Sequence, residues 1–246
     1  MKKYLAVLMA VAGILAVSCK KDDNNGGSTK KPGEDDTEVH ASLKGSAYYP
    51  IILDSESSEL IASKIVCDLR PDDVNKFLYV WPNGETYAGV DANGVNFYGN
   101  ANGFLCMQAT NFSNWTGAGY FVKNTAADLG KLAEIAKNPS QYFIHLAYKG
   151  PANVAHVVRF GDTAKNFFDI CVGQGSVNVD DKLYNAMAPV DGTFVPDEWN
   201  EYEYSVQAAG LNFAVPFPES IDVLEFKSGN QPGAVISLDA AFIYKK

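Results

Sequence analysis

The chain has 246 residues, of which 47% are hydrophobic, and its 29 acidic and 20 basic residues give a net charge of −9. This acidic balance makes nucleic acid and anionic membrane surfaces poor partners, because proteins bind both through clustered Lys and Arg. The four cysteines include no CxxC pair, so a disulfide-dependent fold is not expected.

Residues 1–18 are predicted to be an export signal. Lys2 and Lys3 precede an apolar run from Tyr4 to Val17 that is shorter than a bilayer-spanning helix needs. The run ends in LAVSC, which resembles the lipobox of bacterial lipoproteins, a motif cleaved before its Cys and acylated on that thiol. We therefore expect Cys19 to carry a lipid anchor, and the alternative is a free Cys that follows an ordinary signal peptide.

Residues 19–38 are predicted to be a disordered tether, since no apolar residue occurs between Cys19 and Val39. The Lys-Lys-Asp-Asp that directly follows Cys19 also resembles the signal that sends lipoproteins of Bacteroidota to the outer face of the outer membrane. The expected location is therefore the outer membrane, with the protein lipid-anchored at the cell surface.

Residues 39–246 are predicted to form a single β-sandwich or jelly-roll domain, because no second linker divides them and short apolar segments alternate with turn residues. Gly, Pro, Asn and Asp bound these segments, which is typical of strands in an all-β fold. The predicted strands cover residues 60–69, 76–82, 85–90, 95–99, 103–110, 119–123, 142–148, 155–161, 166–173, 201–207, 221–226 and 234–244.

One short helix is predicted among the strands, at residues 125–139. Thr125 can cap its first turn, apolar residues recur at helical spacing from Leu129 to Ala136, and Asn138-Pro139 ends it. A single inserted helix is compatible with a sandwich and does not indicate alternating βαβ units.

The last predicted strand contains an acidic anomaly. Both of its faces are largely apolar, so it is expected to be central or covered on both sides. Asp239 lies within it, and a carboxylate in such a place needs hydrogen-bond donors, a cation or an open edge. Period-two alternation places these residues on one face: Ile236, Leu238, Ala240, Phe242 and Tyr244.

No catalytic signature stands out. The three histidines lie in unrelated contexts, and no HExxH, GxSxG or Cys-His arrangement is present. A glycoside hydrolase needs two carboxylates at a defined separation. Candidates are the acids of the VPDEWNEYEY segment, which also fit a strand with one solvated face: Asp197, Glu198, Glu201 and Glu203.

Aromatic residues in turn-rich segments are the candidate binding groups. Sugars present flat C–H patches beside hydroxyl groups, and aromatic faces next to polar side chains complement that pattern. The alternative is that these rings simply belong to the core, as large aromatics usually do. The candidates are Trp81, Tyr87, Tyr98, Trp115 and Tyr120.

Several segments resemble surface lipoproteins of Bacteroidota whose jelly-roll, galactose-binding-like domain is similar to carbohydrate-binding modules. They are DLRPDDVNKFLYVWPNGETY, NWTGAGYF and the ending EWNEYEYSV, VLEF and AVISLDAAFIYKK. The resemblance implies a role in polysaccharide utilisation, in which the protein holds glycan for partner enzymes and an outer-membrane transporter.

The resemblance also implies a calcium site and an O-glycosylation site. An Asp in the final strand of such modules often contributes to a structural calcium site, and Asp239 occupies a similar place with the hard oxygen donors that Ca²⁺ prefers. The triplet Asp162-Thr163-Ala164 resembles the O-glycosylation motif of these bacteria.

The leading hypothesis is therefore a non-catalytic, surface-anchored glycan-binding lipoprotein. Its expected ligand platform consists of Trp81, Tyr87, Trp115 and Tyr120. Two alternatives stay open: a glycoside hydrolase or lyase on the same sandwich, and a structural or adhesin-like surface lipoprotein in which all the rings are buried.

Overall fold

The computed structural model describes residues 39–72, 75–80, 86–92, 94–101, 104–109, 117–123, 129–214, 220–229, 231 and 234–246, with the backbone alone at 80, 86–92 and 104–109. The chain divides into residues 1–35 and 36–246, and all described residues belong to the second unit. The expected signal, Cys19 and the tether lie outside the described residues. None of the helices in the described part has the length and hydropathy that crossing a membrane requires.

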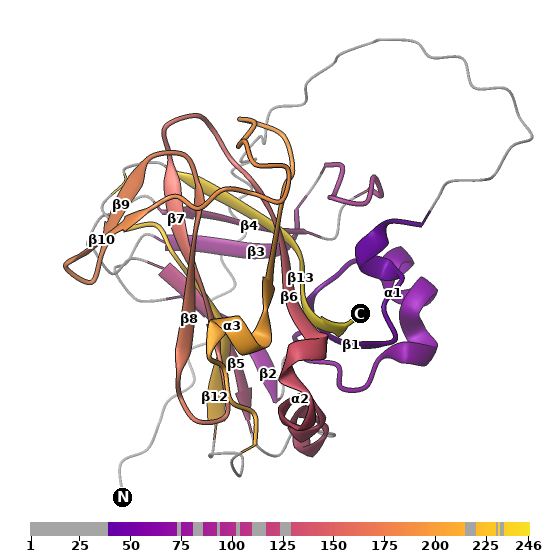
Figure 1. Ribbon diagram of the computed structural model, residues 1–246. Helices are drawn as coiled ribbons and strands as arrows, with labels where there is room; N and C mark the ends of the chain where they lie inside the picture. Colours follow the sequence, from indigo (N-terminus) through magenta and orange to yellow (C-terminus); the bar gives the residue numbers. More distant parts are fainter. Residues whose placement is uncertain are drawn as a thin grey trace, which may run out of the picture. The chain divides into compact units, whose positions relative to one another are not determined.

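Two antiparallel sheets and a hairpin make up the described domain (Figure 1). The first sheet has the order β11 (Asn200–Ser205), β6 (Tyr142–Lys149), β13 (Val235–Lys245), β4 (Phe104–Ala109) and β3 (Thr86–Ala92), and β1 (Ala47–Ile52) also pairs with β13. The second sheet has the order β2 (Lys76–Val80), β5 (Gly117–Lys123), β12 (Ser220–Lys227), β7 (Ala155–Gly161) and β8 (Phe167–Gly173). The hairpin consists of β9 (Ser176–Val179) and β10 (Lys182–Asn185).

The helices are short and lie between strands. The α-helices are α1 (Ser55–Ile61), α2 (Ala133–Lys137) and α3 (Val206–Ala209). The 3-10 turns are η1 (Ala41–Leu43), η2 (Ala62–Lys64), η3 (Leu129–Leu132) and η4 (Pro139–Gln141). In Figure 1, α1 lies beside β1 and the C-terminus, where Ile61 packs into a small cluster with Phe242 and Tyr244.

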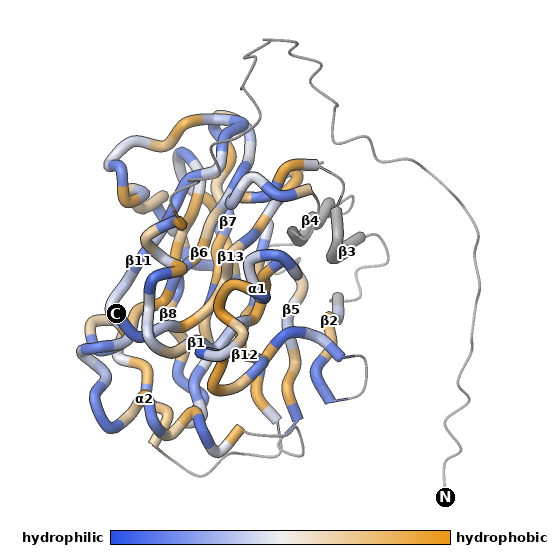
Figure 2. The backbone as a smooth tube through the Cα atoms, turned by 90° about the vertical axis from the view of Figure 1, so that its right-hand side faces the viewer, coloured by the Kyte–Doolittle hydropathy of each residue, from blue (hydrophilic) through white to orange (hydrophobic). Residues whose placement is uncertain are grey.

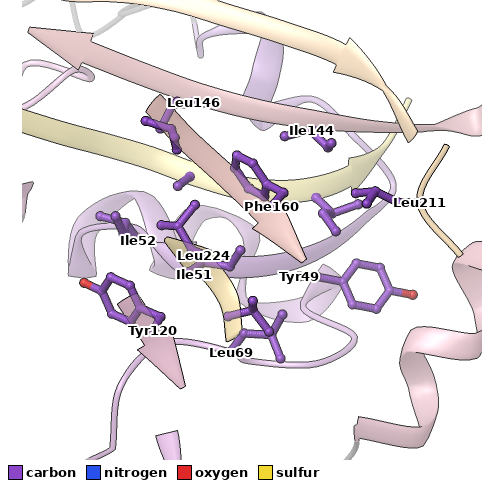
Figure 3. Packing of buried hydrophobic residues seen from close by; sticks show 14 of the residues in the cluster. Tyr49, Ile51, Ile52, Leu69, Tyr120, Ile144, Leu146, Phe160, Leu211 and Leu224 are labelled. Atoms are coloured by element: carbon purple, nitrogen blue, oxygen red, sulfur yellow. The ribbon is translucent and has the colours of Figure 1, made fainter. Parts of the chain in front are cut away.

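The main core lies between the two sheets, as a β-sandwich requires. Figure 3 shows side chains from both sheets meeting there, including Ile144 and Leu146 of β6 with Phe160 of β7 and Leu224 of β12. The expected all-β sandwich is therefore confirmed. Cys67 and Cys171 are both buried, as expected.

Two predicted strands are absent from the described structure. Residues 60–69 contain the end of α1 and the turn η2, because Asp54 caps the helix by accepting a hydrogen bond from the Ser57 amide (2.9 Å). Residues 95–99 form a turn with Gly99 at φ 88°, bounded by an isolated bridge between Val95 and Ala101.

The predicted helix at 125–139 is shorter than expected in the described residues. It consists of η3 followed by α2, and it ends before Asn138-Pro139 as predicted. The proposed cap Thr125 lies outside the described residues. Sequence reasoning missed β1 and the β9–β10 hairpin, whose turn places Asp180 and Asp181 at positive φ (50° and 62°), as the favoured two-residue hairpin turn demands.

The last strand, β13, is central as predicted, but its alternation is interrupted. Its pairing with β6 shifts register between Asp239 and Phe242, and Ala240 takes a left-handed conformation with φ 47°. The bulge exchanges the two faces of the strand. Ile236 and Leu238 point into the main core before it, whereas Phe242 and Tyr244 point to the opposite side after it.

Candidate functional site

The outward-pointing side chains of the second sheet form the candidate site, and we call this surface the outer face. Since Leu78, Tyr120 and Leu224 fill the main core, the neighbouring positions on the same strands point the other way. The β9–β10 hairpin covers one end of this surface by packing Val177 and Val179 on β7 and β8. The outer face contains Phe77, Tyr79, Phe121, Arg159, Asp169, Asp222, Glu225 and Lys227.

Aromatic rings occupy the end of the outer face that lies away from the hairpin, on β2 and β5. The ring of Phe121 lies 5.0 Å from that of Phe77 and meets the ring of Tyr79 edge-on at 6.4 Å. A Cβ at Gly119 would lie 3.2 Å from the Tyr79 ring, so this glycine lets the ring rest closely on β5. All three rings are half-buried, which leaves part of each exposed to a ligand.

The Tyr79 hydroxyl is fixed by a hydrogen bond to another strand of this sheet. It donates a 2.7 Å hydrogen bond to Oδ1 of Asp222 on β12. Burial and this hydrogen bond raise the pKa of Tyr79 well above its ordinary value, so the hydroxyl keeps its proton. Tyr79 therefore presents a ring whose orientation is set by its neighbour.

Charged side chains continue the face across β12, β7 and β8. Arg159 donates from Nε and Nη2 to Asp169 at 2.6 and 3.2 Å, and from Nη1 to Glu225 at 3.4 Å. Lys227 lies 3.6 Å from Glu225 and 2.7 Å from Asp180 of the hairpin. We call this set the charged ladder. Its buried members, Glu225 and Lys227, hold the half-buried Arg159 in place.

Two carboxyl groups of the charged ladder differ in their electrostatics. Burial opposes ionisation of Asp169, but hydrogen bonds from Arg159 and Tyr184 outweigh it, and the pKa of Asp169 is lowered. Burial dominates at Glu225, where the charges of Lys227 and Arg159 do not fully compensate, and its pKa is raised. The face thus combines fixed acceptors, fixed donors and ring surfaces, which together match the hydroxyl and C–H groups of a sugar.

The structure describes only one side chain of the expected platform. Trp81 and Trp115 lie outside the described residues, and Tyr87 lies in β3, where the structure describes the backbone alone. Tyr120 is 1% exposed and belongs to the main core (Figure 3). The expectation that Tyr120 presents its ring to a ligand is therefore wrong, because the alternation of β5 points it inward and gives the outer position to Phe121.

Sequence reasoning missed most of the outer face, although a signal existed. Arg159 is the only charged residue in AHVVRFG, Asp169 the only one in NFFDICVG, and Glu225 shares the apolar strand IDVLEF with Asp222 alone. A single charge in such a strand needs partners, and three such strands in one sheet could have been matched to one another. In KFLYV, Phe77 and Tyr79 are two residues apart, so both rings point to the same side of the strand, where a ligand could contact them.

The acids considered for catalysis do not gather on the outer face. Glu201 and Glu203 lie on β11 of the other sheet, and Asp197 and Glu198 lie in the loop before it. Burial opposes ionisation of Glu201, but its hydrogen bond with His145 outweighs burial and lowers its pKa. A general acid for glycoside cleavage needs a raised pKa instead, so Glu201 is unsuited to that role.

Asp239 lies in a buried acidic site next to the bulge of β13. It is 0% exposed, and its Oδ2 accepts a hydrogen bond from the Phe97 amide (2.7 Å). Asp54, also buried, accepts hydrogen bonds on Oδ1 from the Ser57 amide and from Nδ2 of Asn100 (3.0 Å). The loop at 96–100 therefore joins the two carboxylates.

The acidic site has donor atoms that fit a hard cation. Within the described residues, Oδ1 of Asp239 and Oδ2 of Asp54 are buried without a hydrogen-bond partner. Burial raises the pKa of Asp239 to about 7, and the nearby charge of Asp54 adds to the rise. No group of three or more His, Cys, Asp or Glu forms a metal site in the described part of the chain. Any further ligands from the described residues would be amide or backbone oxygens, which Ca²⁺ accepts.

The triplet at residues 162–164 is a structural turn. Thr163 is 4% exposed, and its hydroxyl donates to the Asn212 carbonyl (3.1 Å). Asp162 accepts hydrogen bonds from the amides of Ala164 and Asn166, both at 2.8 Å. The suggestion of O-glycosylation at Thr163 is wrong for the folded domain, because the hydroxyl is covered and already bonded.

Comparisons with known proteins give only distant similarity. No family model and no curated protein matches the sequence. Among solved structures, a family 11 carbohydrate-binding module of a cellulosomal cellulase from Clostridium thermocellum is 10% identical over 70% of this chain and 89% of its own, with a TM-score of 0.37. The SGBP-B protein of a xyloglucan utilization locus in Bacteroides uniformis is 10% identical, with coverages of 71% and 48% and a TM-score of 0.34. An adhesin domain of Lys-gingipain from Porphyromonas gingivalis is also 10% identical, with coverages of 70% and 92% and a TM-score of 0.34. With TM-scores below 0.5, these similarities do not assign a family or a function, and the fold is defined by the arrangement of the two sheets.

Proposed function

We propose that this protein is a non-catalytic glycan-binding protein whose ligand lies along the outer face of the second sheet. The observation that supports the proposal is the arrangement of Phe77, Tyr79 and Phe121 beside the charged ladder. Ring faces contact the C–H patches of a sugar, while Asp222, Asp169 and Arg159 exchange hydrogen bonds with its hydroxyl groups.

Trp81 and Trp115 extend this surface in the proposal. Trp81 follows Tyr79 by two residues, and Trp115 precedes Gly117 of β5 by two residues. If period-two alternation continues past the described ends of β2 and β5, both indoles fall on the outer face. Both positions lie outside the described residues, so this placement stays a prediction.

Affinity electrophoresis against plant, host and microbial polysaccharides tests the proposal. We expect at least one polysaccharide to retard the protein, and we expect Tyr79→Ala, Trp81→Ala and Trp115→Ala each to weaken binding about tenfold, or about 1.4 kcal/mol. Trp199→Ala is the matched control, because that indole donates to the Val95 carbonyl on the other sheet's side. Absence of any retardation, or normal binding by all three variants, contradicts the proposal and favours the adhesin-like alternative.

The proposal includes surface anchoring. Cys19 carries the lipid, residues 19–38 form the tether, and the domain faces outward from the outer membrane, where it delivers glycan to a transporter. Metabolic labelling with a fatty acid tests the anchor: label should be incorporated by the wild type and lost in Cys19→Ser. Protease treatment of intact cells tests the orientation, since an inward-facing domain would survive.

We also propose that Asp54 and Asp239 hold a structural Ca²⁺, supported by their two buried, unpartnered oxygens. A cation there would join β13, α1 and the 96–100 loop. Saturating calcium should raise the melting temperature relative to EGTA, because a ligand at a hundred times its Kd stabilises by about 2.7 kcal/mol. Asp239→Asn should abolish the rise, and Asp197→Asn on the exposed loop should retain it. Equal melting temperatures with and without calcium would refute the site.

A lyase or glycoside hydrolase is the second candidate, and the observation that favours it is the raised pKa of Glu225 beside the lowered one of Asp169. Groups with diverging pKa values on one face are typical of acid–base pairs. Product release from a retained polysaccharide, lost in Glu225→Gln, would establish catalysis. We expect no release, because Glu225 is buried and contacts both Arg159 and Lys227.

A further inference from the structure

A cleft of about 500 Å³ lies on the first sheet, on the side of the sandwich opposite the outer face. Its walls include Ser42, Val190, Glu201, Glu203 and Lys246. In Figure 2 the C-terminus lies beside β11, the strand that carries both glutamates. Cavities of a few hundred Å³ accommodate small ligands, so the question is which chemistry this cleft accepts.

Glu201 belongs to the cleft wall, with one carboxylate oxygen held by His145 and the other near His40. His145 is fully buried, and its Nδ1 lies 2.7 Å from the Ala240 carbonyl, which can only accept, so Nδ1 carries a proton. Its Nε2 engages Oε1 of Glu201 at 2.8 Å. The ring is fixed by stacking on Phe242 at 4.6 Å. Glu201, 23% exposed at its side chain, therefore presents Oε2 in a fixed direction.

His40 supplies a donor next to that oxygen. The Ser42 amide donates to its Nδ1 (3.3 Å), so in the neutral ring the proton is on Nε2. Nε2 lies 4.0 Å from Oε2 of Glu201, which is too far for a direct hydrogen bond. The ring is held in place by edge contacts with Phe97 and Tyr98. A fixed donor and a fixed acceptor thus lie close together without bonding each other.

Only a group that both accepts and donates can satisfy this pair. An ammonium group cannot accept from His40, and a carboxylate cannot donate to Glu201. A phosphate can donate through a P–OH group, but its negative charge is repelled by the charge of Glu201. A hydroxyl group does both. Glu203 does not compete for it, because its two oxygens contact the Tyr244 hydroxyl and the Lys246 ammonium. Val190, 56% exposed at the rim, offers an apolar surface to C–H groups.

We propose that this cleft is a second saccharide site, which binds one or two sugar units through a hydroxyl held by Glu201 of the cleft wall and by His40, which precedes the wall residues Ala41 and Ser42. It is separate from the outer face, since its residues come from η1, β11 and the end of β13. It binds short sugars or chain ends, whereas the outer face is open along several strands.

Imidazole resonances in ¹H–¹⁵N NMR spectra test the site, because the chain has only three histidines. The probes are D-glucose, D-galactose, D-mannose and D-xylose, each titrated into the full domain at neutral pH. At least one should shift the His40 resonances saturably and leave those of His156, buried in β7, unchanged. Failure of all four sugars to shift His40 overturns the proposal.

Variants separate the two sites. Glu201→Gln should weaken the sugar affinity at least tenfold, and His40→Ala, followed through His145, should do the same. Glu198→Gln, an exposed acid in the preceding loop, is the matched control and should bind normally. Tyr79→Ala should keep the His40 shift, and loss of the shift in that variant would assign sugar binding to the outer face alone. Retained shifts without polysaccharide retardation would refute the proposed function and leave this site standing.

Discussion

Gly161 shows how little space separates β7 from β12 beneath the outer face. A Cβ at this position would lie 2.1 Å from the Asp222 carbonyl oxygen, which is backbone and cannot turn aside. The contact matters for the site, because Asp222 also accepts the hydroxyl of Tyr79. A side chain at Gly161 would therefore push the strand that orients the aromatic end of the site.

We predict that Gly161→Ala lowers the melting temperature and weakens ligand binding together. Overpacking of this kind costs about 1–3 kcal/mol, which corresponds to several degrees in a domain of this size. Gly130→Ala is the matched control, since a Cβ there meets nothing within 4 Å and should leave stability nearly unchanged. Equal melting temperatures for the two variants, measured by calorimetry, would contradict the strand spacing described for Gly161.

Residue types alone did not separate displayed rings from buried ones. Tyr79 and Tyr120 are both strand tyrosines with aromatic neighbours. Side chains alternate between the two faces of a strand, and this alternation alone places Tyr79 outside and Tyr120 in the core. The sequence predicted that this region is rich in strands and rings. It could not predict which face is buried, because Leu78 and Tyr120 alternate with Phe77, Tyr79 and Phe121, which are all aromatic.

At the scale of elements, turn residues predicted the bounds of several strands correctly. The strands at 142–148, 155–161 and 166–173 were predicted to within a residue of their observed bounds, since turn residues bound them clearly. The apolar run from Leu60 predicts a strand that overlaps the end of α1, whereas the Asp54 cap favours the helix that the structure shows. The bulge of β13 could not be predicted, because both faces of that strand are apolar and a slip of one residue leaves the pattern intact.

The bulge at Ala240 connects three features of the first sheet. It reverses the faces of β13, directs the Ala240 carbonyl to His145, and follows directly after Asp239. We predict that Ala240→Gly retains stability within about 1 kcal/mol, because glycine adopts the positive φ freely. Ala240→Val should be destabilised by several kcal/mol, because a β-branched residue at φ 47° is strained and has no room. Urea unfolding measures both, and a Val variant as stable as wild type would show that the bulge had moved.

The whole sandwich carries its polar groups in separate places. The charged ladder lies on the second sheet, the His40–Glu201 pair on the first, and the acidic site of Asp54 and Asp239 beside α1. The main core contains buried His156, whose imidazole lies at 5.8 Å from the Tyr148 ring. Two of these groups, His156 and Asp239, have pKa values shifted strongly in opposite directions, so the stability of the domain must depend on pH through both.

The signs of these two effects are opposite. Burial lowers the pKa of His156 from 6.5 to about 4, so between these values the unfolded chain binds the proton and stability rises with pH. Burial raises the pKa of Asp239 from 3.8 to about 7, so over that range the folded domain binds the proton and stability falls as pH rises. Each shift corresponds to about 3–4 kcal/mol. In the absence of calcium the two effects should largely cancel between pH 4 and 6.5.

We therefore predict that Asp239→Asn becomes more stable as pH rises from about 4 to 6.5, relative to wild type, when both proteins have been treated with EGTA at neutral pH and dialysed free of calcium. His156→Gln should show the reverse trend. The difference between each variant and wild type isolates one group, because the other acids contribute equally to both proteins. Thermal melts across this pH range provide the measurement. Parallel curves for wild type and Asp239→Asn would mean that Asp239 is ionised and compensated in the folded domain. A tightly bound cation that EGTA fails to remove would also give parallel curves. Calcium analysis of the dialysed protein distinguishes the two cases.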